Sequence, residues 1–79
     1  MHQIEAFYER RRDLQIRGES IGKGDECWER LGIANRLLQR ISNRMIAMSP
    51  GIERDITRCF EHVDRWLTAA NPPTAEARE

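Results

Sequence analysis

This sequence has no net charge, no long apolar run and few aromatic side chains. Its 79 residues carry 13 basic and 13 acidic side chains, so the formal net charge is zero. A neutral protein lacks the positive charge with which many proteins bind nucleic acids or acidic membranes. No apolar run exceeds four residues, whereas a membrane helix needs about 20 and a secretory leader at least about 7. We therefore expect a cytoplasmic protein.

Cysteine is equally sparse, with only Cys27 and Cys59 in the chain. If the chain turns near residue 49 between two antiparallel helices, Cys59 lies opposite about residue 39, and Cys27 lies about 18 Å further along. That separation excludes an intrachain disulfide. The two histidines, His2 and His62, show no zinc-binding spacing with these cysteines. We expect two buried, reduced thiols and no metal or other cofactor.

Motifs of catalysis and phosphate binding are missing as well. The segment Gly18–Gly24 contains three glycines, but it follows an expected helix and lacks the lysine–hydroxyl ending of a phosphate loop. We interpret it as a flexible connector. Glu5, Glu9 and Asp13 share one helix face, but this face lies opposite the apolar one, whereas catalytic or metal-binding carboxylates usually converge in a buried site. The sequence gives no indication of an enzyme.

Helical periodicity is what the sequence does contain. Residues 2–17 predict a first helix, because its apolar side chains fall on one side: Ile4, Phe7, Tyr8 and Leu14. Arg11 projects into the middle of this stripe. Since an unpaired buried charge is costly, we expect Arg11 either to reach water or to meet a carboxylate on a neighbouring helix or subunit.

Residues 25–48 predict a second helix with a longer apolar seam, and Asp25 is its candidate cap. Steps of four and three residues alternate along this seam, as in a coiled coil: Cys27, Leu31, Ala34, Leu38, Ile41, Met45 and Met48. Ser49-Pro50-Gly51 then marks a boundary. Serine accepts hydrogen bonds from the free amides at a helix start, and proline is favoured at the first helical position.

A third helix is predicted for residues 50–70, and Asn71-Pro72-Pro73 ends it because proline cannot continue a helix. Its seam has the same rhythm: Ile52, Ile56, Cys59, Val63, Trp66 and Ala70, widened by Phe60 and Leu67. We therefore predict an all-α three-helix bundle in which residues 25–48 and 50–70 form an antiparallel hairpin. Residues 1–71 form a single domain, and residues 72–79 are expected to be a disordered polar tail.

The helix expected at 25–48 also has a face without charge. It lies beside the apolar seam and away from the charged side: Trp28, Gly32, Asn35, Gln39, Ser42, Asn43 and Ile46. Solvated helix faces usually collect charged residues, whereas the cores of interfaces are depleted of them. We therefore expect this face to be covered by the first helix, by a second copy of the chain or by another protein.

An arginine row, formed by Arg36, Arg40 and Arg44, runs along the charged side of the same predicted helix. It indicates either a solvated face or a stripe that contacts phosphates or the acidic side chains of a partner. The uncharged face and the arginine row together provide the candidate partner-binding residues: Trp28, Asn35, Arg36, Gln39, Arg40, Arg44 and Ile46.

These features favour binding over catalysis. We expect a non-enzymatic protein-binding module, a homodimer, that bridges or occludes a larger partner as a small inhibitor, adaptor or regulator. An anti-defence protein encoded by a phage or plasmid is one concrete form. The alternative is a nucleic-acid-binding transcriptional regulator whose helix-turn-helix motif turns at Met48–Gly51. Against this alternative, the three arginines of residues 50–70 are outnumbered by four carboxylates.

Overall fold

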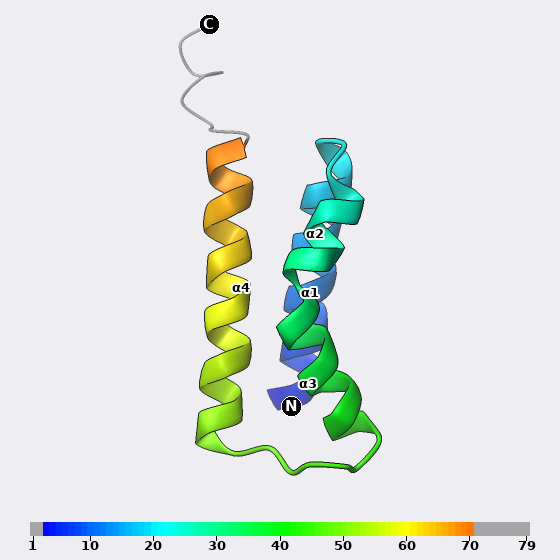
Figure 1. The fold of residues 1–79 in the computed structure, drawn as a ribbon, viewed down its shortest axis with the longest axis vertical. Helices are drawn as coiled ribbons and strands as arrows, with labels where there is room; N and C mark the ends of the chain where they lie inside the picture. Colours follow the sequence, from blue (N-terminus) through cyan, green and yellow to red (C-terminus); the bar gives the residue numbers. More distant parts are fainter. Residues whose placement is uncertain (1–2, 71–79) are drawn as a thin grey trace, which may run out of the picture.

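Four helices make up the described part of the chain, residues 3–70, in which the computed structural model contains no strand. They are α1 (Gln3–Ser20), α2 (Gly24–Arg30), α3 (Gly32–Ser42) and α4 (Pro50–Ala70). α2 and α3 follow one another down the bundle, antiparallel to both α1 and α4 (Figure 1). The all-helical prediction is confirmed, but there are four helices instead of three. The tail expected at 72–79 lies outside the described residues.

The start of α4 follows the signals in the sequence. The backbone amide of Ile52 donates a hydrogen bond to the Ser49 hydroxyl at 3.3 Å, and the amide of Glu53 donates to the Ser49 carbonyl at 2.8 Å. Pro50 then occupies the first helical position, where its missing amide hydrogen costs nothing. The predicted helix over residues 50–70 is confirmed.

α1 is longer than predicted, because Gly18 lies inside the helix and does not end it. Gly18 is buried, and a Cβ at this position would lie 2.6 Å from the Cβ of Cys27. The glycine therefore lets α2 pack closely against α1. The helix ends two residues later, and Gly22 takes a left-handed φ of 76° in the turn that follows. α2 begins at Gly24, so Asp25 lies in its first turn and is not its cap.

The single helix predicted for residues 25–48 is interrupted between α2 and α3. Leu31 has φ −81° and ψ 3°, away from regular helical values, and it is followed by Gly32, a poor helix former. Hydrogen bonds still cross the break, because the Leu31 amide donates to Cys27 and its carbonyl accepts from Asn35. On both sides of the break the seam stays in the core: Cys27, Leu31, Ala34 and Leu38 are fully buried, as the seam predicts.

α3 ends at Ser42, well before the predicted residue 48. Arg44 adopts a left-handed φ of 59°, its amide donates to the Ile41 carbonyl at 3.0 Å, and the Met45 amide donates to the Arg40 carbonyl at 2.8 Å. These bonds form the Schellman motif that often ends a helix, with arginine in the position that glycine usually takes. Met45 therefore leaves the predicted seam and is 68% exposed.

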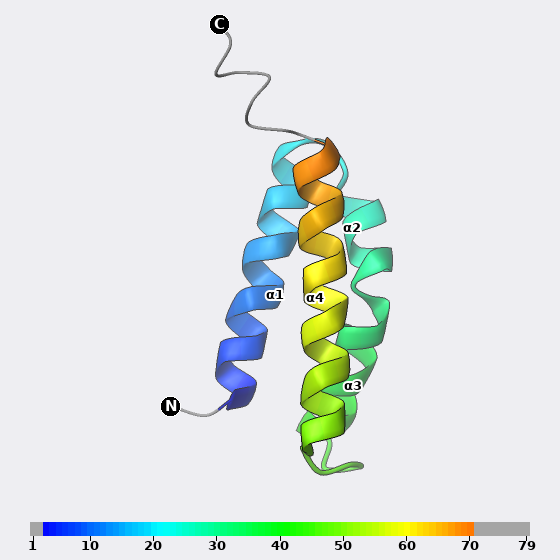
Figure 2. The same cartoon turned by 90° about the vertical axis from the view of Figure 1, so that its left-hand side faces the viewer.

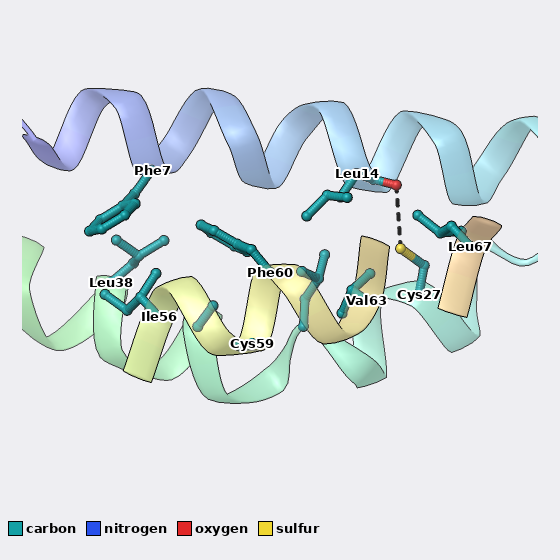
Figure 3. Packing of buried hydrophobic residues seen from close by; sticks show 11 residues of the cluster. Phe7, Leu14, Cys27, Leu38, Ile56, Cys59, Phe60, Val63 and Leu67 are labelled. Carbon is teal, nitrogen blue, oxygen red and sulfur yellow. Dashed lines mark hydrogen bonds between the residues drawn. The ribbon is translucent and has the colours of Figure 1, made fainter. Parts of the chain in front are cut away.

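The core lies where α1 covers one side of the other helices (Figure 2). The Phe7 and Phe60 rings meet edge to face, with centroids 6.0 Å apart, and the Cys27 thiol donates to the Leu14 carbonyl at 3.5 Å (Figure 3). Eleven buried residues form the cluster: Phe7, Leu14, Cys27, Leu31, Ala34, Leu38, Ile56, Cys59, Phe60, Val63 and Leu67. None of the described helices has both the length and the apolar character needed to cross a membrane.

Ion pairs with one carboxylate link α1 to α4. Asp64 accepts hydrogen bonds from Arg17 at 2.6 Å and from Arg10 at 3.3 Å. The hydrogen bond from Arg17 contributes most to a lowered pKa of Asp64, and the positive charges of both arginines add to the effect. The carboxylate therefore stays ionised to a lower pH in the folded protein, and it fixes two turns of α1 against α4.

Candidate functional site

The uncharged face expected on residues 25–48 lies partly beneath α1. The Tyr8 hydroxyl donates to the Leu38 carbonyl at 3.4 Å and forms a hydrogen bond with the Ser42 hydroxyl. The Arg11 guanidinium lies 4.9 Å from the centroid of the Tyr8 ring and 5.6 Å from that of Trp28. The sequence left three possibilities for what covers this face: the first helix, a second copy of the chain or another protein. In the structure α1 covers at least part of it. Arg11 is stabilised by two aromatic rings, whereas the sequence suggested water or a carboxylate.

The seven candidate partner-binding residues do not form one surface. Trp28 lies beside Arg11 of α1 and is 50% exposed, the Asn35 Oδ1 is enclosed without a hydrogen-bond partner among residues 3–70, and Gln39 is exposed. Arg36 and Arg40 lie on the exposed outer side of α3. Arg44 and Ile46 fall in the connection after α3, so neither continues a helical row. The prediction of a continuous face is wrong at its carboxyl end because α3 stops at residue 42.

A groove that sequence reasoning missed lies between α2–α3 and α4. It is a surface hollow of about 390 Å³, lined by Arg30, Ile33, Asp55, Arg58, Cys59 and His62. We call it the α3–α4 groove. Its lining residues come from α2, α3 and α4, and α1 contributes none of them. The groove is therefore open on the side of the hairpin that α1 leaves free.

The floor of the groove is apolar, and its one thiol is a poor nucleophile. Ile33 is 58% exposed. Cys59 lies below it, and its thiol donates to the Arg30 carbonyl at 3.5 Å. Burial raises the pKa of the Cys59 thiol, which is therefore neutral and a poor nucleophile near pH 7. Cys27 is likewise buried and free, so the predicted burial of both thiols is confirmed.

One rim of the groove is a stacked arginine. The Arg30 guanidinium lies 4.4 Å from the centroid of the Trp66 ring and pairs with Glu26 at 2.9 Å. The aromatic ring and the carboxylate hold this planar cation against the protein. Arg30 thus forms an ordered wall beside the exposed Ile33 side chain.

Unpaired arginines lie at the groove and on the helix face of Ile33: Arg58 lines the groove, and Arg36 and Arg40 follow Ile33 by three and seven residues on α3. Between Glu29 and Glu53 the sequence has no acidic residue, although it contains four arginines: Arg30, Arg36, Arg40 and Arg44. Ion pairs within residues 3–70 involve only Arg10, Arg17 and Arg30, so Arg36, Arg40 and Arg58 have no carboxylate partner there. The zero net charge of the whole chain conceals this local excess, which the spacing of the acidic residues shows directly.

No known protein family, curated protein or solved structure matches this chain. Among the described residues, no group of three or more histidines, cysteines and carboxylates is placed to hold a metal ion. Within the groove, Cys59 donates its hydrogen bond to a backbone carbonyl and not to His62 or Asp55. This geometry is suited to holding a ligand by contact, with an exposed apolar side chain flanked by two arginines and Asp55.

Proposed function

We propose that the protein is a non-enzymatic protein-binding module and that the α3–α4 groove is its docking surface. The observation that carries the proposal is the exposed Ile33 side chain in a hollow walled by Arg30 and Arg58. Arginine and large apolar side chains are enriched at the centres of protein interfaces, where contact excludes water. The module would act in the cytoplasm by occluding or bridging a larger protein, as a small inhibitor, adaptor or regulator.

The homodimer expected from the sequence depended on apolar area left uncovered beside the seam of residues 25–48. α1 lies against part of that area through Tyr8 and Arg11, so less of it is free to contact a second copy. We propose a different protein as the partner. Light scattering after size exclusion tests this directly, because a monomer has a mass of 9.3 kDa.

The antiparallel course of α3 and α4 weighs against the transcriptional regulator. Helix-turn-helix motifs join two helices at about 90–120° through a turn of 3–4 residues. Here residues 43–49 connect two helices that lie side by side (Figure 1). α4 buries its apolar face, as a recognition helix also does, but residues 50–70 carry three arginines and four carboxylates and so offer DNA no cationic surface.

The proposal is tested by comparing two equally exposed isoleucines. Ile33 is 58% exposed in the groove, and Ile16 is 54% exposed on α1. The tagged wild type, Ile33→Glu and Ile16→Glu are used as bait in extracts of the cells that produce the protein. Wild type and Ile16→Glu should retain the same partner, and Ile33→Glu should lose it. Equal capture by all three baits would show that the groove is not the docking surface.

A further inference from the structure

The shape of the α3–α4 groove favours a helix as its occupant. α2–α3 and α4 run antiparallel beside one another, and α1 occupies one side of the pair (Figures 1 and 2). α1, α2–α3 and α4 thus form three columns, and the groove between the last two gives a fourth helix a place to pack. On α4 the lining residues recur at helical spacing from Asp55 to His62, a length of about 10 Å, which matches two turns of a helix packed alongside.

The floor of the groove requires an apolar side chain from this occupant. Ile33 projects far enough to be 58% exposed, while Cys59 beneath it is only 9% exposed. A docked helix with apolar residues at positions i, i+3 or i+4, and i+7 would cover Ile33 and fill the hollow, as in other helix-in-groove complexes. The occupant is therefore amphipathic.

The charges of the rim determine the polar flanks of the occupant. Arg58 lines the groove, and Arg36 and Arg40 follow Ile33 by three and seven residues, so they share its face of α3. None of these three arginines has a carboxylate partner within residues 3–70, and Asp55 is the acidic residue among those that line the groove. Guanidinium groups bind carboxylates in a two-bond geometry, so a helix with glutamates or aspartates beside its apolar stripe satisfies them. A second copy of this chain would instead bring the same arginines together, and like charges repel across an interface.

Nucleic acid fits the groove less well than an acidic helix. A phosphate backbone would contact the arginines, but it offers no apolar surface to cover Ile33 and would meet the Asp55 carboxylate at the groove. Resting on the proposed function, we infer that the partner presents an acidic amphipathic helix, which lies in the α3–α4 groove as the fourth helix of a bundle.

Two synthetic peptides test this inference with the purified full-length chain. Both have about 18 residues, or five turns, and the same leucine stripe; glutamates flank the stripe in one and lysines in the other. Fluorescence anisotropy of the labelled peptides should show that the glutamate peptide binds at least about tenfold more tightly. Because charge contributes to this difference, it should shrink as salt rises.

Variants locate the binding site of the peptide. Ile33→Glu should weaken binding of the glutamate peptide at least about tenfold, and Ile16→Glu should leave it unchanged. The pair Arg36→Gln and Arg58→Gln in one chain should reduce the preference for glutamate over lysine while preserving the fold. Both arginines are exposed, and circular dichroism melting of each variant verifies that folding is intact.

Each alternative outcome overturns the inference in a recognisable way. The acidic helix would be refuted if the two peptides bound equally, if the lysine peptide bound better, or if neither bound. In that case, loss of the partner by the Ile33→Glu bait would still support the groove as the docking surface. Salt-sensitive binding of random duplex DNA that is unaffected by Ile33→Glu would assign the arginines to nucleic acid. A dimeric mass by light scattering that Ile33→Glu abolishes would assign the groove to a second copy.

Discussion

Replacing Gly18 with alanine tests why α1 and α2 pack so closely. The added methyl group would lie 2.6 Å from the Cβ and 2.9 Å from the Sγ of Cys27, whereas carbon atoms in contact are normally about 3.5–4.0 Å apart. The Cys27 Cβ is fixed to its backbone, so no change of rotamer can move it away. The two helices must separate by roughly 1 Å at this position, or local backbone must distort.

The expected cost follows from two opposing effects. Overpacking of this kind typically destabilises by about 1–3 kcal/mol, and the rigid Cys27 contact places Gly18→Ala towards the upper end. Alanine recovers up to about 1 kcal/mol because it is a better helix former than glycine. We expect a net loss of about 1–2 kcal/mol in the free energy of unfolding, or a fall in Tm of about 5–15 °C for a domain of this size.

Thermal and urea melts followed by circular dichroism measure this change, with Gly32→Ala as the matched control. Gly32 is also helical, but a Cβ there meets no atom within 4 Å. The control should therefore be neutral or stabilising by up to about 1 kcal/mol. If Gly18→Ala proves as stable as the control, then the close approach of α1 and α2 does not depend on the missing side chain, and the argument fails.

Three further predictions concern the end of α3, the ion pairs of α1 and the thiols. Arg44→Gly should stabilise the protein by about 0.5–1 kcal/mol in urea melts, because glycine adopts the left-handed φ without the cost that arginine bears. A loss of stability would show that the left-handed conformation of Arg44 carries no such cost. Asp64→Asn should destabilise by about 0.5–1 kcal/mol at neutral pH. Since the folded pKa of Asp64 is lowered mainly by Arg17, this difference should be constant above about pH 5, begin to shrink near the unfolded pKa of about 3.9, and vanish once the pH has fallen through the lower folded pKa; a difference that does not shrink as the pH is lowered from about 5 would contradict it. A bulky thiol reagent should label Cys59 at the groove before Cys27, which is fully buried, and both more slowly than in urea; prompt labelling of Cys27 would place it outside the core.

Local signals predicted α4 well, because they act over a few residues. Ser49 and Pro50 specify a helix start through one hydrogen bond and one fixed dihedral angle, and the structure contains both. The buried seam from Cys27 to Leu38 was also predictable, since helical spacing alone places these residues on one side. These features depend on the sequence of one helix alone and not on which residues of another helix pack against it.

Features that depend on a distant partner were not predictable in the same way. Gly18 resembles a helix breaker until Cys27 is known to pack against it. Arg44 has no sequence signal for a left-handed conformation, which arginine rarely adopts. Ile33 lies between arginines on the charged side of its helix, and only the position of α4 shows that it borders a hollow. The lack of acidic residues between Glu29 and Glu53 was available from the sequence and would have indicated the cationic rim.

The order of the helices along the chain has a consequence for how quickly this protein folds. α1 packs most extensively on α2, and α3 packs on α4, so each hairpin joins neighbouring segments of sequence. Contacts between close sequence neighbours require little loop closure, and helical domains of this kind fold in about microseconds to milliseconds. The Phe7–Phe60 contact and the ion pairs of Asp64 join the two hairpins across most of the chain. In temperature-jump relaxation, changes at Gly18 should therefore slow folding, whereas changes at Asp64 should mainly speed unfolding.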